Sequence, residues 1–160
     1  TRYWRDWSSD VCSSDLNMIA LSMMSDTATA SYILIVDDDP TIRSILEALL
    51  EDEGFDPVTA TNGQEALRIV ADDRPSLILM DLMMPVMSGV DAVRVLKEDP
   101  ETADIPVIAM SAGFILRESI EELLADGIIA KPFDLDALIA SIHATLRQSN
   151  DDHHQSAPSA

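Results

Sequence analysis

The central part of the chain repeats one unit five times: a short apolar run, a polar loop and a segment with helical periodicity. Three of the runs, 33–36, 77–80 and 107–110, are unbroken apolar stretches, and two weaker runs lie at 56–61 and 128–130. Unbroken apolar runs of this length are typical of parallel strands that are covered on both faces. Strands that alternate with helices favour one parallel sheet with right-handed crossovers and helices on both sides. We therefore expect a doubly wound α/β fold.

Capping residues and apolar spacing predict the helices. Four of the helical segments begin after a side chain that commonly caps a helix N-terminus: Asp39, Asn62, Ser88 and Asp134. Apolar residues follow each cap at helical spacing, and they include Ile45 in the first helix and Leu135 in the last. Gly54 is expected to end the first helix, and a further helix is expected to carry apolar residues from Leu116 to Leu124. We assign these apolar stripes to the core.

The N-terminal end does not share this periodicity. Residues 1–16 hold both tryptophans and the only cysteine, and residues 6–16 resemble the translation of a sequencing-library adapter. We interpret residues 1–23 as a non-native or disordered leader that takes no part in the fold. A disordered native tail and a weak targeting segment are the alternatives. The candidate natural starts are Met18, Met23 and Met24.

The remaining chain has the size and composition of one domain. Hydrophobic residues make up 47% of the sequence, enough for a core in a single domain over residues 31–148. Residues 149–160 are polar and aperiodic and predict a disordered tail. No apolar stretch is long enough to span a membrane. If Cys12 belongs to the leader, disulfides and a cysteine nucleophile are excluded, and we expect a cytoplasmic protein.

The charge balance limits the kinds of partner. The formal net charge is −19, and no basic face is evident in the sequence. Proteins that bind nucleic acids directly need such a face to neutralise phosphates. We therefore expect no direct nucleic-acid binding.

Polar side chains follow four of the five predicted strands. They are Asp37, Asp38 and Asp39 after the first, Asp81 after the third, Ser111 after the fourth and Lys131 after the fifth. Each of them, taken singly, is commonly a turn former, a helix cap or a surface charge, and we assign that role to Asp39, which precedes Pro40. In open α/β sheets, however, sites lie outside the carboxyl ends of the strands. The sequence therefore predicts that these side chains meet at one edge of the sheet.

This combination of side chains points to phosphoryl transfer. Converging carboxylates repel one another unless a cation lies among them, and an all-oxygen cluster with open positions suits Mg²⁺. A carboxylate can attack phosphorus and form an acyl phosphate, while a metal ion and an ammonium group neutralise the equatorial oxygens. Asp81 is the predicted nucleophile and Lys131 the predicted counter-charge.

Four segments together resemble the signatures of response-regulator receiver domains. They occur in order between residues 32 and 147 and read ILIVDDDP, LILMDLMMPVMSG, VIAMSAG and IIAKPF. The resemblance implies a flavodoxin-like (β/α)5 fold with strand order 2-1-3-4-5. It also implies a stand-alone receiver that is phosphorylated by a histidine kinase or histidine phosphotransferase and that signals through a downstream protein target.

The resemblance further implies a role for each matching residue. Asp81 is expected to be the phosphoacceptor, Ser111 to hydrogen-bond the phosphoryl group and Lys131 to pair with it, with a cis bond between Lys131 and Pro132. The expected Mg²⁺ ligands are Asp37, Asp38, Asp81 and the backbone carbonyl of Met83. Pro85 and Gly89 fit the loop that shapes the site, although simple loop punctuation is an alternative that spacing does not exclude.

One position departs from the family pattern. Family members usually carry an aromatic residue three positions before the lysine, and this chain has Ile128 there. Isoleucine is stiff and has no polar tip, so we expect altered coupling between phosphorylation and the output face.

Three other functions share parts of this pattern. A flavodoxin-like cofactor binder would offer amides rather than three aspartates after the first strand. A phosphatase with an aspartate nucleophile would need a second carboxylate where the chain has Met83, so we expect no true turnover enzyme, only self-phosphorylation from a phosphodonor and slow self-dephosphorylation. A pseudo-receiver that binds proteins without being phosphorylated is the third alternative.

Overall fold

A computed structural model describes residues 32–112 and 123–155 of the chain. Five parallel strands form one sheet in the order β2-β1-β3-β4-β5. The strands are β1 (Tyr32–Val36), β2 (Asp56–Ala60), β3 (Leu77–Asp81), β4 (Val107–Ala112) and β5 (Gly127–Lys131). The helices within the described residues are α2 (Pro40–Asp52), α3 (Gly63–Asp72), α4 (Gly89–Glu98) and α6 (Leu135–Gln155). The predicted doubly wound sheet and its strand order are confirmed.

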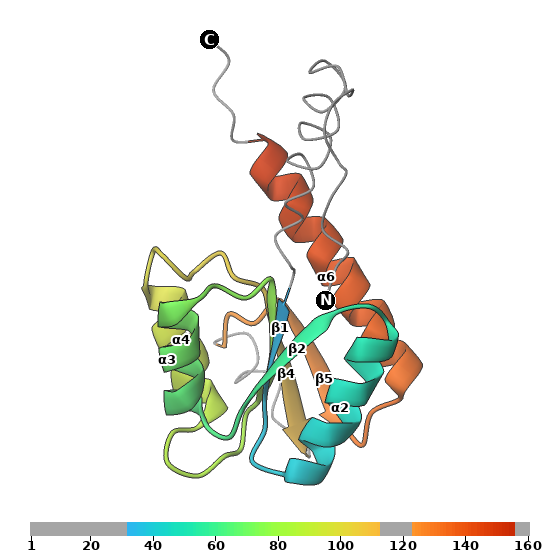
Figure 1. The fold of residues 1–160 in the computed structure, drawn as a ribbon. Coiled ribbons are helices and arrows are strands. Elements are labelled where there is room, and N and C mark those ends of the chain that lie inside the picture. Colours follow the sequence, from blue (N-terminus) through green and yellow to red (C-terminus); the bar gives the residue numbers. More distant parts are fainter. Residues whose placement is uncertain (1–31, 113–122, 156–160) are drawn as a thin grey trace, which may run out of the picture. The chain divides into compact units, whose positions relative to one another are not determined.

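Two apolar clusters, one on each face of the sheet, form the core. Helices α3 and α4 cover one face, and α2 and α6 cover the other (Figure 1). Strand β1 contributes to both clusters, because Leu34 and Val36 point to the α3 and α4 side while Ile33 and Ile35 point to the α2 and α6 side. Since no face of the strand meets water, its apolar run is unbroken.

The four predicted caps all accept a backbone N–H at the start of their helices. The pairs are Asp39 with Thr41 at 2.8 Å, Asn62 with Glu65 at 2.9 Å, Ser88 with Asp91 at 3.2 Å and Asp134 with Ala137 at 3.0 Å. Asp39 is thus confirmed as a cap. Gly54 lies just beyond the end of α2 with φ +84°, which is the left-handed conformation that glycine adopts most easily.

Three large side chains of the predicted apolar stripes are exposed rather than in the core. Ile45 is 48% exposed and Leu135 39%, because a helical stripe also includes residues at the margin of the buried contact. Leu124 is 65% exposed and has φ +54°, so it lies in a turn rather than in a helix. Leu123 is buried in the core as expected, and the part of the predicted helix from Leu116 to residue 122 lies outside the described residues.

The last helix is longer than the sequence predicted. α6 continues to Gln155, whereas we expected an irregular tail from residue 149. The physical reason is that no glycine or proline interrupts the polar segment before Pro158. The predicted leader lies outside the described residues. Among the described helices, none combines the length and the apolarity that crossing a membrane requires.

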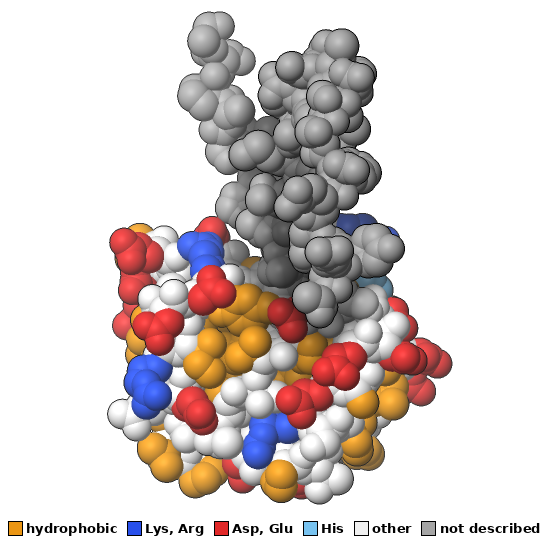
Figure 2. Space-filling view, viewed as in Figure 1, with side chains coloured by type: hydrophobic (Ala, Val, Ile, Leu, Met, Phe, Trp, Pro, Cys, Tyr) orange, Lys and Arg blue, Asp and Glu red, His pale blue; other side chains and the backbone are white. Residues whose placement is uncertain are grey.

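The surface of the domain is predominantly acidic, as the net charge requires. Acidic side chains are spread across the face shown in Figure 2, with hydrophobic side chains exposed between them. The high negative charge is therefore not gathered into a single patch on this face.

Candidate functional site

The predicted polar residues meet at the carboxyl ends of four neighbouring strands. Asp37 follows β1 directly, while Asp81 is the last residue of β3 and Lys131 the last of β5. Ser111 lies one residue before the end of β4, where it is paired with Ala130. Strands β3, β4 and β5 thus extend slightly further than the apolar runs predicted, because Asp81, Ser111 and Lys131 still take part in the ladder. The expected convergence at one edge of the sheet is confirmed.

Lys131 joins two of the carboxylates. Its ammonium group donates a hydrogen bond to Asp37 Oδ2 at 2.5 Å and another to Asp81 Oδ2 at 2.8 Å. Both aspartates are buried, Asp37 completely and Asp81 with only 5% exposure. Burial alone would lower the pKa of Lys131, but the hydrogen bonds and charges of Asp37 and Asp81 outweigh burial and raise it. The lysine is therefore held in its charged form between the two carboxylates.

Backbone N–H groups hold the other oxygen of each carboxylate. Asp37 Oδ1 accepts from the N–H of Asp39 at 2.9 Å, and Asp81 Oδ1 accepts from the N–H of Met83 at 3.1 Å. These short loops orient the carboxylates before any ligand arrives. The side chain of Met83 is 67% exposed and points away from the core.

A third carboxylate completes an oxygen cluster. Carboxylate oxygens of Asp37, Asp38 and Asp81 all lie within 4.8 Å of one another, and Asp38 is the exposed member. Three carboxylates against one ammonium leave two negative charges, which a divalent cation neutralises. Oxygen ligands and a side open to water are what Mg²⁺ prefers. The donor set therefore fits a hard divalent cation.

Ser111 presents a hydroxyl group that has no hydrogen-bond partner among the described residues, although the atom is buried. An unsatisfied buried hydroxyl costs about 1–3 kcal/mol, so a bound water, an ion or a polar ligand commonly supplies the partner of such a group. The position of Ser111 near the end of β4 is consistent with that interpretation.

The comparisons with known proteins agree with this geometry. The family model described as the response regulator receiver domain matches residues 33–143. The chain belongs to this family. We refer to residues 32–155 as the receiver domain from here on.

The relatives include a DNA-binding regulator and a transcriptional regulator, and the matched segment makes up about half of each. The receiver domain resembles the phosphate regulon transcriptional regulatory protein PhoB of Pseudomonas aeruginosa, with 40% identity over 73% of the chain and 52% of that protein. It also resembles the DNA-binding response regulator MtrA of Mycolicibacterium smegmatis, with 37% identity over 75% of the chain and 52% of that protein. The chain thus spans about half the length of these curated relatives.

Solved structures give the same result. The signal receiver domain of a histidine kinase from Syntrophus aciditrophicus has a TM-score of 0.71 and 36% identity, and the match covers 74% of this chain and 92% of that one. A CheY-like receiver domain protein from Methanospirillum hungatei also has a TM-score of 0.71, with 26% identity over 76% of this chain and 98% of that one.

Two sequence predictions about the surrounding loops are clarified by the receiver domain structure. The bond between Lys131 and Pro132 is cis, as the resemblance implied. Gly89 is more than loop punctuation, because a β-carbon there would lie 1.9 Å from the backbone oxygen of Asp81. The first turn of α4 therefore packs directly against the backbone of the predicted phosphoacceptor.

The sequence analysis missed Arg43. Its guanidinium group donates a hydrogen bond to the backbone oxygen of Asp37 at 2.6 Å. The sequence did place Arg43 near the site, since this residue lies in the first turn of the helix that follows the acidic loop. Helical spacing alone did not show that its side chain turns back toward that loop.

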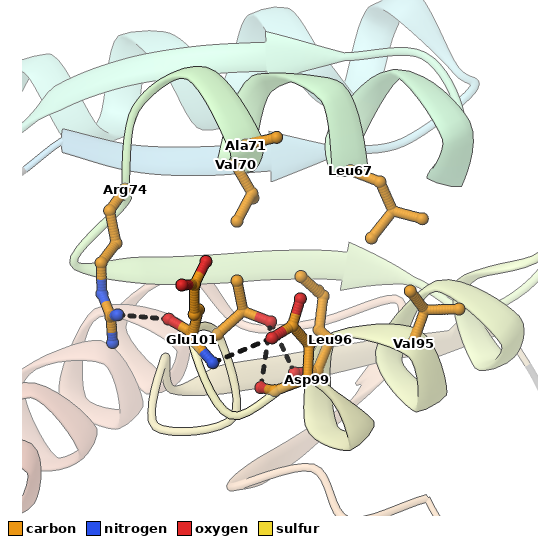
Figure 3. Close-up of a pocket in the computed structure, with 9 residues that line it drawn as sticks. Leu67, Val70, Ala71, Arg74, Val95, Leu96, Asp99 and Glu101 are labelled. Atoms are coloured by element: carbon orange, nitrogen blue, oxygen red, sulfur yellow. Dashed lines mark hydrogen bonds between the residues drawn. The ribbon is translucent and has the colours of Figure 1, made fainter.

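Among the hollows lined by described residues, two lie at opposite ends of the sheet. One adjoins the acidic cluster and is lined by Lys131 together with mostly apolar residues, among them Ile42, Ile45, Phe133 and Leu135. The other lies between α3 and α4 at the end where the strands begin (Figure 3). There Arg74 donates to the carbonyl of Glu101 and pairs with Asp104. Since the carboxylate cluster adjoins only the first hollow, we place the chemistry there.

Proposed function

We propose that the receiver domain accepts a phosphoryl group on Asp81 from the phosphohistidine of a histidine kinase or histidine phosphotransferase. The observation that carries the proposal is the contact of one partly buried ammonium, Lys131, with both Asp37 and Asp81 inside an oxygen cluster suited to Mg²⁺. A carboxylate oxygen of Asp81 would form the new bond to phosphorus as the bond from phosphorus to the histidine nitrogen breaks. The imidazole would leave as the neutral base after taking up a proton.

Each neighbouring residue has a distinct part in this reaction. Asp37, Asp38, Asp81 and the backbone carbonyl of Met83 would hold Mg²⁺, which when bound neutralises charge on the phosphoryl oxygens. Lys131 would shift from the carboxylate of Asp81 to the phosphoryl group, so its positive charge follows the developing negative charge. The buried hydroxyl of Ser111 would donate the hydrogen bond that it lacks among the described residues.

The apolar hollow beside Lys131 supports a protein as the phosphodonor. It is lined by Lys131, which contacts the proposed nucleophile Asp81, and the exposed Ile45 and Leu135 in its lining offer a surface that a partner protein would cover. A small phosphodonor would need no such surface.

The output is proposed to be a contact with a downstream protein in the cytoplasm. The receiver domain has no carboxylate at position 83 to act as acid and base, so we propose slow self-dephosphorylation rather than turnover catalysis. The DNA binding named for MtrA and the transcriptional regulation named for PhoB belong to those longer proteins. We propose that the acidic domain described here does not contact nucleic acid itself.

The proposal is tested by incubating the chain with acetyl phosphate and Mg²⁺ and measuring the intact mass. We expect the mass of one phosphoryl group to appear, to require Mg²⁺ and to be absent from Asp81→Asn. Asp72→Asn, at the carboxyl end of α3, is the matched control and should be phosphorylated like the wild type. If the folded wild-type protein gains no mass, phosphoacceptor function is abandoned in favour of a pseudo-receiver that acts by binding alone.

A further inference from the structure

The side chain of Arg43 returns from α2 to the acidic loop. Its guanidinium group donates a hydrogen bond to the backbone oxygen of Asp37 at 2.6 Å. The backbone N–H of Arg43 donates to the backbone carbonyl of Asp39 at 3.1 Å. Arg43 is therefore tied to both ends of the segment that carries Asp38.

Asp37 has a hydrogen-bond partner at every polar atom. Its N–H donates to the carbonyl of Ala60 at 3.2 Å, and its two carboxylate oxygens accept from the N–H of Asp39 and from Lys131. The bond from Arg43 to its carbonyl completes the set. Because the peptide unit is planar, holding the carbonyl of Asp37 also fixes the orientation of the N–H of Asp38 and the direction in which its chain leaves.

Asp38 lacks such support. It is exposed, and no described residue forms a hydrogen bond or ion pair with its carboxylate. The place of this carboxylate beside Asp37 and Asp81 thus depends on the orientation of the backbone that carries it.

We propose that Arg43 is a positioning residue for the divalent-cation site, which acts by holding the peptide between Asp37 and Asp38 so that the Asp38 carboxylate faces the cluster. The inference rests on the proposed function, because it assumes that this cluster binds Mg²⁺. Partners of metal ligands commonly change metal affinity by about 10–100-fold when they are removed.

A purely electrostatic role for Arg43 makes the opposite prediction. A positive charge close to the cluster repels a cation, so its removal would strengthen Mg²⁺ binding. The charge of Arg43 does reach neighbouring acids: hydrogen bonds from Thr61 are the main cause of the lowered pKa of Glu65, and the charges of Arg68 and Arg43 add to them. Arg68 is exposed on α3, affects the same glutamate and makes no hydrogen bond to Asp37, so it provides a matched control.

The test is a direct titration of the unphosphorylated protein with Mg²⁺ in the absence of a phosphodonor. Binding is measured by calorimetry or from the shifts of amide NMR signals. We expect Arg43→Gln to weaken Mg²⁺ binding by about tenfold or more. Arg43→Lys should recover part of the loss, and Arg68→Gln should bind Mg²⁺ as the wild type does or slightly more tightly. Thermal unfolding in a chelator separates this effect from a general loss of stability.

A double-mutant cycle with Asp38→Asn tests whether Arg43 changes Mg²⁺ affinity through Asp38. If Arg43 acts through Asp38, Arg43→Gln should cost little further affinity in the Asp38→Asn background. Equal losses in both backgrounds, or tighter binding by Arg43→Gln alone, would overturn the positioning role. If Arg43→Gln does not fold, the same comparison is made with Arg43→Lys. A wild-type protein that binds no Mg²⁺ contradicts the cation site itself, which is a separate outcome from failure of the Arg43 proposal.

Discussion

At the scale of single residues, burial and partner charges decide which groups stay protonated. Lys131 stays charged because two buried carboxylates contact its ammonium, and removing Lys131 would leave both carboxylates without this cationic partner. Tyr32 illustrates the same balance away from the site. Burial and the nearby charge of Asp73 raise its pKa from 10.0 to about 12, and its hydroxyl donates to the backbone oxygen of Asp73.

The raised pKa of Tyr32 predicts a loss of stability at alkaline pH. The folded state keeps the phenol protonated more strongly than the unfolded state does, so the contribution is present below pH 10.0 and is lost as the pH rises to about 12. We expect the free energy of unfolding to fall less steeply in this interval for Tyr32→Phe than for the wild type. Urea denaturation across the interval measures the difference, and parallel curves for the two proteins would contradict it. The raised pKa of Lys131 also lowers the free energy of unfolding at alkaline pH, but it does so equally in the wild type and in Tyr32→Phe.

At the scale of elements, the start of α4 packs backbone against backbone on the end of β3. Gly89 begins α4, and its α-carbon lies so close to the carbonyl of Asp81 that no side chain fits between them. Gly54 follows α2 with nothing within 4 Å of an added β-carbon, and only its φ of +84° favours glycine. Substitution of Gly89 therefore tests the need for space, and substitution of Gly54 tests the need for a left-handed backbone conformation.

We expect Gly89→Ala to be the more damaging of the two substitutions. Forcing the start of α4 away from β3 should destabilise the protein by roughly 1–3 kcal/mol or more and weaken Mg²⁺ binding, because the backbone of Asp81 must move. Gly54→Ala should cost about 1 kcal/mol through backbone strain and leave Mg²⁺ binding unchanged. Urea denaturation and Mg²⁺ titration of both variants make the comparison. Equal effects on Mg²⁺ binding would show that the contact with Asp81 is not what matters.

At the scale of the whole molecule, one residue of the candidate site and Ile128 lie on the same strand, β5. β5 is an edge strand whose last residue is Lys131, and Ile128 lies three residues earlier with 36% of its surface exposed. A change at the proposed phosphorylation site therefore has a short path to this edge of the sheet. Ile128 offers no polar tip to respond to it.

We predict that a phosphate mimic moves the β5 surface little in this protein. With beryllofluoride and Mg²⁺, the largest amide shifts should come from the residues around Asp81, Ser111 and Lys131, with small shifts along the rest of β5 and α6. Ile128→Tyr, which introduces the aromatic residue usual in the family, should enlarge the shifts in β5. Large shifts in the wild-type β5 would refute the altered coupling, and an unchanged pattern in Ile128→Tyr would show that another residue controls it.

The sequence alone was sufficient for the fold and for most of the candidate site. Unbroken apolar runs are produced by burial on both faces of a parallel sheet, and a helix cap is a local hydrogen bond, so both can be recognised from neighbouring residues. The same rule placed Asp37, Asp81 and Lys131 at one edge of the sheet, because parallel strands end together.

The tertiary structure decided what depends on residues far apart in the chain. The sharing of Lys131 between two carboxylates, the unpartnered hydroxyl of Ser111 and the return of Arg43 to the acidic loop are all matters of side-chain direction. The exposure of Ile45 and Leu135, which the apolar pattern had assigned to the core, is likewise set by where each helix meets the sheet. Periodicity states which face of a helix is apolar, but only packing in three dimensions decides how much of that face is covered and which polar atoms come within hydrogen-bonding distance.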